Sequence, residues 1–158
     1  MNNNDIIRRL RFTFSFDDQK MIKIFGLAER DTSRAEVSAW LKKEDAEGYE
    51  ILYDKDFSYF LDGLIYEFRG KKEGPLSKPE KRLNNNIIFR KLKIALSLKD
   101  EDILEILMLV DFRMGKHELS AFFRNPAQSQ FRKCKDQVLR NFVHGLQVKY
   151  YVDNSSKV

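Results

Sequence analysis

The sequence contains two copies of one segment, and this duplication limits the possible folds more than any other feature. Residues 2–64 align with residues 84–146 at a constant offset of 82 and without a gap. The first copy opens with "NNNDIIRRLRFTFSF" at Asn2, and the second opens with "NNNIIFRKLKIALSL" at Asn84. An ungapped match of this length indicates a tandem duplication. Whatever fold one copy adopts, we therefore expect the other copy to adopt as well.

The hydrophobic pattern of both copies is helical. In the first copy, apolar residues recur at spacings of three and four, which places them on one face of a helix. The four sets are Ile6, Leu10 and Phe14; Met21, Ile24, Phe25 and Ala28; Val37, Trp40 and Leu41; and Phe57, Phe60, Leu61 and Leu64. The second copy has apolar residues at the matching positions. The sequence thus predicts an all-α protein with roughly four helices per copy and the two copies packed together.

The composition places the domain boundaries between the copies and near the end of the chain. The segment "FRGKKEGPLSKPEKR" combines glycine, proline and charged residues, as loops do. We therefore assign residues 1–67 to the first helical repeat, 68–82 to a linker and 83–151 to the second repeat. The final residues, 152–158, include the polar sequence "DNSSKV", and we expect them to be frayed.

The bulk composition favours a cytoplasmic protein. Hydrophobic residues make up 42% of the 158 residues, which is enough for a core, and no apolar run approaches the ~20 residues of a membrane span. We expect no membrane association and no cofactor. Residues 1–82 contain 16 Lys and Arg and 16 Asp and Glu, whereas residues 83–158 contain 13 and 8. This excess suggests an acidic partner for the second copy, although solubility alone would also explain it.

The three asparagines at the start of each copy have two interpretations. Asn4 and Asn86 are candidate N-caps, because the asparagine side chain accepts a hydrogen bond from an unpaired backbone N–H. One asparagine per helix would suffice for that purpose. The additional amides, together with Arg8 and Arg11 or with Arg90 and Lys93, could instead contact the phosphate of a ligand. The duplication is compatible with both interpretations.

A helix-turn-helix outline suggests nucleic-acid binding. In the second copy, "DEDILEILMLV" and "KHELSAFFRN" would form two helices around a short turn, with polar side chains exposed on the second helix. Many all-α proteins that bind no DNA share this outline. The candidate nucleic-acid-binding residues are Asn4, Arg8, Arg11, Lys42, Asn86, Arg90, Lys93, Lys116 and Arg124.

No motif indicates catalysis or metal binding. His117 and His144 have no partner at zinc-ligand spacing, and there is no phosphate-binding glycine loop. Lysines flank Cys134 and could lower its pKa, but a passive cysteine on a helix is the simpler interpretation. We therefore expect a binding protein rather than an enzyme.

Three stretches resemble the YehS family of small bacterial proteins with a duplicated domain of unknown function. They are "WLKKEDAEGYE", "FLDGLIYEFRGKKEG" and "LNNNIIFRKLKIALSLKDEDI", and the resemblance extends over essentially the whole chain. It implies a cytoplasmic bacterial protein with the duplicated architecture. It implies no activity and no site residues.

The residues leave two functional hypotheses. The first is a nucleic-acid-binding or regulatory protein that contacts DNA or RNA through basic helix faces. The second is a protein-interaction or structural module, which could be a homodimer, because a groove between two helical copies can hold an amphipathic helix. We take the first as the working hypothesis, since it is the more specific.

Overall fold

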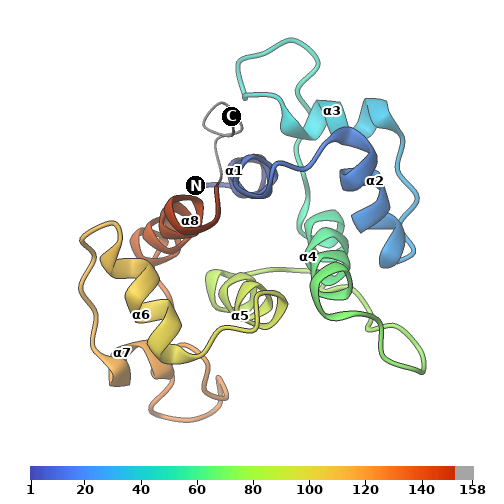
Figure 1. Cartoon of the computed structure of the whole chain (residues 1–158). Helices are drawn as coiled ribbons and strands as arrows, with labels where there is room; N and C mark the ends of the chain where they lie inside the picture. The colour runs from blue at the N-terminus through green and yellow to red at the C-terminus, as the bar shows by residue number, and fades with distance from the viewer. Residues whose placement is uncertain (152–158) are drawn as a thin grey trace, which may run out of the picture.

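The computed structural model describes residues 1–151, which form eight helices and no strand (Figure 1). The expected frayed tail, 152–158, lies outside the described residues. The first repeat contains α1 (Asn3–Phe14), α2 (Asp18–Leu27), α3 (Arg34–Leu41) and α4 (Asp54–Arg69). The second contains α5 (Asn85–Ala95), α6 (Asp100–Met108), α7 (Lys116–Ala121) and α8 (Asp136–Tyr150). The prediction of an all-α protein with four helices per copy is confirmed.

The two repeats pack together through two equivalent interfaces. Helix α4 of the first repeat lies against α5 of the second, and α8 of the second lies against α1 of the first. Seen end-on in Figure 1, these four helices surround the centre of the molecule. Helices α2 and α3 flank one side, and α6 and α7 flank the opposite side. Each repeat therefore completes the other's packing.

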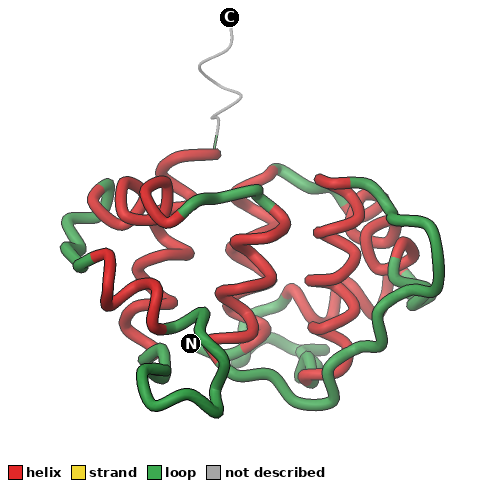
Figure 2. Tube along the Cα trace, turned by 90° about the horizontal axis from the view of Figure 1, so that it is seen from below, coloured by secondary structure: helices red, strands yellow, loops and turns green. Residues whose placement is uncertain are grey.

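The four central helices run parallel. At one end, the side chain of Asn3 at the start of α1 donates to the carboxylate of Asp54 at the start of α4, at 2.8 Å. At the other end, the ring of Phe14 in the last turn of α1 packs against Phe68 of α4 and Tyr150 of α8. In the side view of Figure 2 the chain's N-terminus accordingly lies at the opposite end from the last helix's C-terminus.

Parallel packing aligns the four helix dipoles, and the sequence places charges that complement them. The first turns of α1, α4 and α8 are acidic, whereas each of the four helices has a basic residue in its last turn. These last-turn residues are Arg11, Arg69, Lys93 and Lys149. Each such charge stabilises its helix by ~0.3–1 kcal/mol.

Two matched glycines allow the flanking helices to approach the centre. A Cβ atom on Gly63 of α4 would lie 1.9 Å from the backbone oxygen of Ile24 in α2. A Cβ atom on Gly145 of α8 would lie 2.5 Å from the backbone oxygen of Ile106 in α6. Both distances are shorter than any real contact, so these positions require glycine. The recurrence of glycine at these two matching positions therefore has the same structural cause in both copies.

The connecting segment between the repeats occupies residues 70–84. Helix α4 continues to Arg69, two residues beyond the boundary expected from composition, because its hydrophobic stripe extends to Phe68 at the aromatic cluster. The segment then returns from the C-terminal end of α4 to its N-terminal end. There the backbone N–H of Leu83 donates to the carboxylate of Asp54 at 2.9 Å. It thus runs beside the α4–α5 interface.

Candidate nucleic-acid interface

The first asparagine of each triplet caps the helix. The side chain of Asn2 accepts from the backbone N–H of Asp5 at 2.8 Å, and that of Asn84 accepts from Ile87 at 2.9 Å. The prediction that Asn4 and Asn86 are the caps was therefore wrong by two positions. The preference of asparagine for caps is local and does not distinguish among three adjacent asparagines.

The second asparagine of each triplet connects the first helix of its repeat to the fourth. Asn3 donates to the carboxylate of Asp54, as described above, and Asn85 donates to that of Asp136 at 2.7 Å. The same two side chains also donate to a backbone carbonyl just before the fourth helix. These bonds fix the N-terminal ends of the parallel pair in each repeat.

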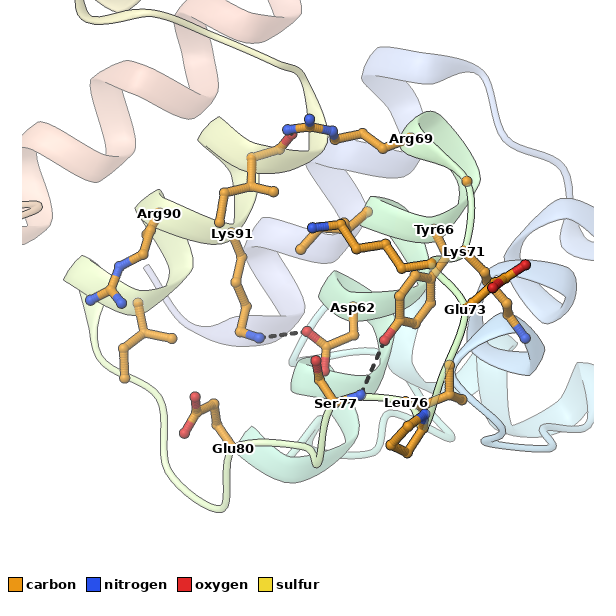
Figure 3. Close-up of a pocket in the computed structure, with 16 residues that line it drawn as sticks. Asp62, Tyr66, Arg69, Lys71, Glu73, Leu76, Ser77, Glu80, Arg90 and Lys91 are labelled. Atoms are coloured by element: carbon orange, nitrogen blue, oxygen red, sulfur yellow. Dashed lines mark hydrogen bonds and ion pairs between the residues drawn. The ribbon is translucent and has the colours of Figure 1, made fainter.

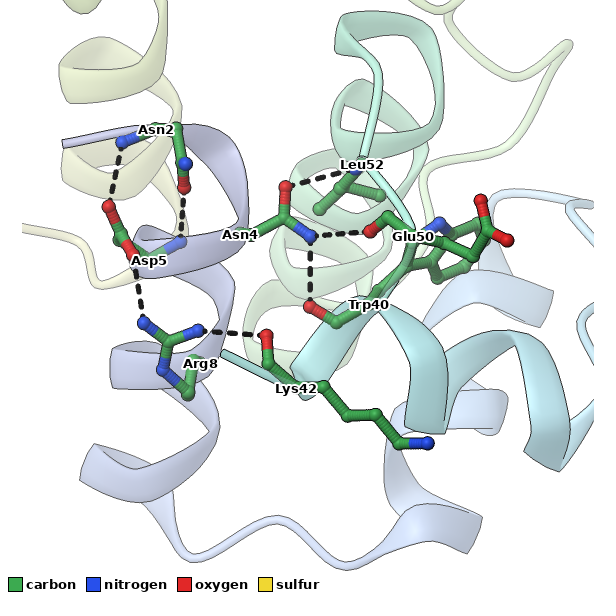
Figure 4. Close-up of polar contacts among 8 residues, drawn as sticks. All are labelled: Asn2, Asn4, Asp5, Arg8, Trp40, Lys42, Glu50 and Leu52. Carbon is green, nitrogen blue, oxygen red and sulfur yellow. Dashed lines mark hydrogen bonds and ion pairs between the residues drawn. The ribbon is translucent and has the colours of Figure 1, made fainter. Parts of the chain in front are cut away.

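The third asparagine connects its helix to the end of the third helix and to the loop before the fourth helix (Figure 4). The side-chain nitrogen of Asn4 donates to the carbonyls of Trp40 and Glu50, at 3.0 and 2.8 Å. Its oxygen accepts from the backbone N–H of Leu52 at 3.0 Å. Asn4 is 2% exposed. Both amide hydrogens are used inside the protein, so Asn4 has no donor for a ligand.

Asn86 repeats this arrangement in the second copy. It donates to the carbonyls of Phe122 and Arg132, at 3.0 and 2.9 Å, and accepts from the backbone N–H of Cys134 at 2.9 Å. The expected ligand contact by Asn4 and Asn86 is therefore contradicted by the structure. Both residues have a structural role, and their recurrence in register follows from it.

Two further candidates in the first repeat make contacts within it. The guanidinium of Arg8 pairs with Asp5 at 2.8 Å and donates to the carbonyl of Lys42 at 3.2 Å (Figure 4). The ammonium of Lys42 donates to the carbonyl of Glu47 at 3.1 Å. Neither side chain belongs to a group of unpaired cations.

The candidates around the helix-turn-helix outline are also paired. Lys116 of α7 pairs with Glu101 of α6 at 2.7 Å, and the side chain of Arg124 bonds to that of Gln130. Helix α7 has six residues, fewer than two turns. A helix this short offers little length to the major groove of DNA, so α7 is a poor recognition helix.

Arg90 and Lys93 are the two candidates that lie together, on the exposed side of α5. They line a cavity of about 400 Å³, which they share with Arg69 of α4. Lys93 pairs with Asp100 at 2.9 Å and lies 4.2 Å from the ring centroid of Phe123. Arg90 forms no ion pair with any described residue. The last candidate, Arg11, lies in the final turn of α1, outside this cavity.

A larger cavity adjoins the first between α4, the connecting segment and α5 (Figure 3). Its volume is about 600 Å³, and the two cavities share Arg69, Arg90 and Ile94. We call the cationic surface along both cavities the basic groove; it consists of Arg69, Lys71, Lys72, Arg90 and Lys93. Among these, only Lys93 has a carboxylate partner within the described residues.

The basic groove corresponds to one basic segment of the sequence, which the expected domain boundary at residue 82 divides in two. Residues 69–93 contain nine Lys and Arg and two Glu, so this segment alone exceeds the net charge of +5 of the whole chain. Splitting the chain at residue 82 assigned six of the nine cations to a first half that was neutral in total. Arg69, Lys71 and Lys72 were missed for this reason.

A buried ion pair forms one wall of the larger cavity. Asp62 of α4 is 4% exposed, and its Oδ1 atom lies 2.5 Å from the ammonium of Lys91 on α5. Burial raises the pKa of Asp62 above its ordinary value of 3.8, against the opposing effect of Lys91, and nearby Glu80 raises it further. Tyr66 lies on the same side and accepts from the backbone N–H of Ser77 at 3.4 Å.

The two interfaces between the repeats differ at these positions. At the α1–α8 interface, the residue matching Asp62 is His144 and the residue matching Lys91 is Arg9. His144 is exposed, and Arg9 donates to the side chain of Gln147 at 3.2 Å. Asp62 instead faces the cavity that the connecting segment lines. The duplication therefore produced two equivalent interfaces, and the segment between the copies encloses one of them.

The part of the chain that the structure describes offers neither a metal cluster nor a membrane-spanning helix. Within residues 1–151, no group of three or more His, Cys, Asp or Glu could hold a metal ion. No helix of those residues is long and apolar enough to cross a membrane.

The fold and its repeat define a class of small proteins built from two interlocked four-helix units. The model of the family described as "Protein of unknown function (DUF1456)" matches the chain twice, at residues 3–70 and 85–151, so the chain belongs to this family. It is 42% identical over 153 residues to the Uncharacterized protein YehS of Escherichia coli (strain K12), covering 96% of this chain and 98% of that one. No solved structure matches. The expected family resemblance and duplication are confirmed.

Proposed function

We propose that the protein binds nucleic acid through the basic groove. The observation that supports this proposal most directly is that Arg69, Lys71, Lys72 and Arg90 line two adjoining cavities without any carboxylate partner among the described residues. Cations held close together without acidic partners attract a polyanion, and each phosphate they neutralise releases counterions. Arginine and lysine side chains supply most phosphate contacts in such complexes.

Complementing the helix dipoles does not explain the whole groove. Arg69 and Lys93 lie in the last turns of α4 and α5, where a cation stabilises its own helix. Arg90 lies in the middle of α5, and Lys71 and Lys72 lie in the connecting segment beyond α4. These three charges have no such structural role. They are the part of the groove that a ligand would explain.

The shape of the groove favours a single strand over a duplex. It lies between two helices and the connecting segment, and the rings of Tyr66 and Phe123 line its two cavities. Proteins that bind single strands combine a basic groove along the backbone with aromatic rings on which bases stack. A duplex would instead need a projecting helix or ribbon to enter its major groove.

Binding to labelled single-stranded DNA, RNA and double-stranded DNA tests this proposal. We expect saturable binding to a single strand that weakens steeply as salt increases. The Arg69→Ala/Arg90→Ala variant should lose at least about ten-fold in affinity at low salt. The Lys116→Ala/Arg124→Ala variant removes the same charge away from the groove and should bind like the wild type. Absence of binding at low salt, or an equal loss in both variants, would contradict the proposal.

A second candidate function has one observation in its favour. Ile51 and Tyr53 of the first repeat are 53% and 67% exposed beside a cavity of about 600 Å³, whereas the matching residues of the second repeat are Lys133 and Lys135. An apolar surface in one copy alone suggests a contact with another protein or a second copy of this chain. Light scattering of the wild type and of Ile51→Ser/Tyr53→Ser tests it: a dimer that the variant abolishes supports self-association, and identical monomers exclude it.

A further inference from the structure

The larger cavity contains a buried carboxylate with a free oxygen. Asp62 uses Oδ1 for its ion pair with Lys91, and its Oδ2 atom has no hydrogen-bond partner among the described residues. Figure 3 shows this carboxylate facing the cavity between Lys91 and the connecting segment. This oxygen is accessible from the cavity, so a ligand N–H donor can reach it.

Three polar groups meet at this wall of the cavity. Lys91 supplies a donor, since one ammonium hydrogen bonds to Asp62 and two others are available. Asp62 supplies the free acceptor described above. Glu80, from the connecting segment, lines the same cavity and is near enough to raise the pKa of Asp62. The wall thus presents one donor and two anionic acceptors.

The remaining lining suits a planar ring attached to a phosphate. Tyr66 presents an aromatic ring, and Ile65, Pro75 and Ile87 are apolar. The basic groove begins at the cavity's edge with Arg90 and Lys71. A volume of about 600 Å³ lies within the range of small-molecule sites. A nucleotide has the required parts in the required order: a planar base, a sugar and a phosphate.

From this arrangement we infer that the cavity binds a guanine base whose phosphate lies in the basic groove. Among the common bases, guanine alone presents one carbonyl oxygen beside two adjacent N–H donors on its Watson–Crick edge. Lys91 donates to that oxygen, and Asp62 and Glu80 accept from the two donors. Uracil and thymine present a single donor between two carbonyls, which would face carboxylates. An unstacked base read on this edge is a common mode of single-strand recognition.

The inference rests on the proposed function in one respect, the position of the phosphate in the basic groove. A guanine base with a phosphate can come from two sources. One is a free guanine nucleotide, and the other is a guanosine within a single strand. GMP and UMP represent the free nucleotides. Two 12-residue DNA strands, all-thymidine with and without one central guanosine, represent the second source.

Calorimetric titration of the full chain provides the first test. GMP should bind at least about ten-fold more tightly than UMP, as one well-placed set of base-edge hydrogen bonds allows. Glu80→Gln should abolish this preference. Glu80 is exposed, so its substitution leaves the core intact. Glu73→Gln makes the same change in charge on the same cavity and should keep the preference. Asp62→Asn should lose it as well, with helical content checked by circular dichroism.

The strands separate this inference from the proposed function. A ten-fold advantage for the guanosine-containing strand, lost in Glu80→Gln, supports recognition within a strand. A GMP preference without any strand preference supports the free nucleotide as the ligand. If both strands bind equally and salt-dependently and GMP binds no better than UMP, the inference is overturned while the proposed function stands. If neither strand binds but the GMP preference holds, the proposed function fails and the guanine site remains.

Discussion

Asn4 and Asn86 lie at matching positions of the two repeats and make the same three hydrogen bonds. Each donates once to a carbonyl at the end of the third helix and once to a carbonyl of the loop before the fourth helix, and accepts once from that loop's backbone N–H, at 2.8 to 3.0 Å. The side chain therefore supplies bonds that the irregular loop backbone cannot make for itself. The duplication preserved this buried amide together with the loop it holds.

Replacing either buried asparagine should destabilise the protein. Asn4→Ala or Asn86→Ala leaves one N–H and two carbonyls without their partner, and we expect a loss of about 1–3 kcal/mol in the free energy of unfolding. Urea unfolding measures this loss. Asn141→Ala is the matched control, because its one side-chain bond lies at the surface of α8. Equal stability of Asn4→Ala and Asn141→Ala would refute the structural role of Asn4.

Alanine substitutions at three helical glycines should change the stability of the protein in opposite directions. Gly63→Ala and Gly145→Ala place a Cβ atom against a backbone oxygen of the neighbouring helix, so we expect each to lose at least about 1–3 kcal/mol. Gly26 of α2 has no atom within 4 Å of the Cβ position, so Gly26→Ala should gain about 0.5–1 kcal/mol from helix propensity. Thermal unfolding distinguishes these outcomes. A gain in stability for Gly63→Ala would show that α2 and α4 are farther apart.

The buried pair of Asp62 and Lys91 should make stability depend on pH. A carboxyl with a pKa raised by folding holds its proton more tightly in the folded state, so the free energy of unfolding decreases as pH rises above 3.8 through the raised value. Lys91 limits this effect and Glu80 increases it. Asp62→Asn lacks the titrating group, so its stability relative to the wild type should improve as pH rises above 3.8. A difference that stays constant over this range would contradict the raised pKa.

Cys134 should be unreactive in the folded protein. The thiol is 5% exposed, and burial raises its pKa to about 12, so the flanking lysines do not activate it. A thiol reagent such as DTNB should label the native protein slowly and the urea-unfolded protein rapidly at the same pH. Rapid labelling under native conditions would show that the loop after α7 opens readily.

Much of the fold could be predicted from local patterns in the sequence. The spacing of Ile6, Leu10 and Phe14 indicates a helix because it reflects the helical repeat alone. The duplication predicts the same fold for both copies, and it can be recognised in the sequence without any knowledge of tertiary contacts. The parallel packing of α1 against α8 could not be predicted in this way. It depends on contacts such as Arg9 with Gln147, which are far apart in the sequence and leave no periodic signal.

The candidate site was predicted less well, for physical reasons. Arg90 and Lys93 were identified because they follow the second asparagine triplet near the start of a predicted helix, where amide and guanidinium donors suit a phosphate. The asparagines were misassigned because their burial depends on loops some 36 to 48 residues away. Lys71 and Lys72 were treated as linker residues, since composition does not show that the connecting segment folds back along α4 and α5.

The most direct test of the central claim is the salt dependence of single-strand binding. The wild type and two variants are titrated with the same labelled strand at several salt concentrations. In Arg90→Ala/Lys93→Ala the slope of log affinity against log salt should flatten by about 0.7 for each phosphate that the variant no longer neutralises. Lys116→Ala/Arg124→Ala should keep the wild-type slope. Identical slopes in all three proteins would contradict the claim that a strand lies in the basic groove.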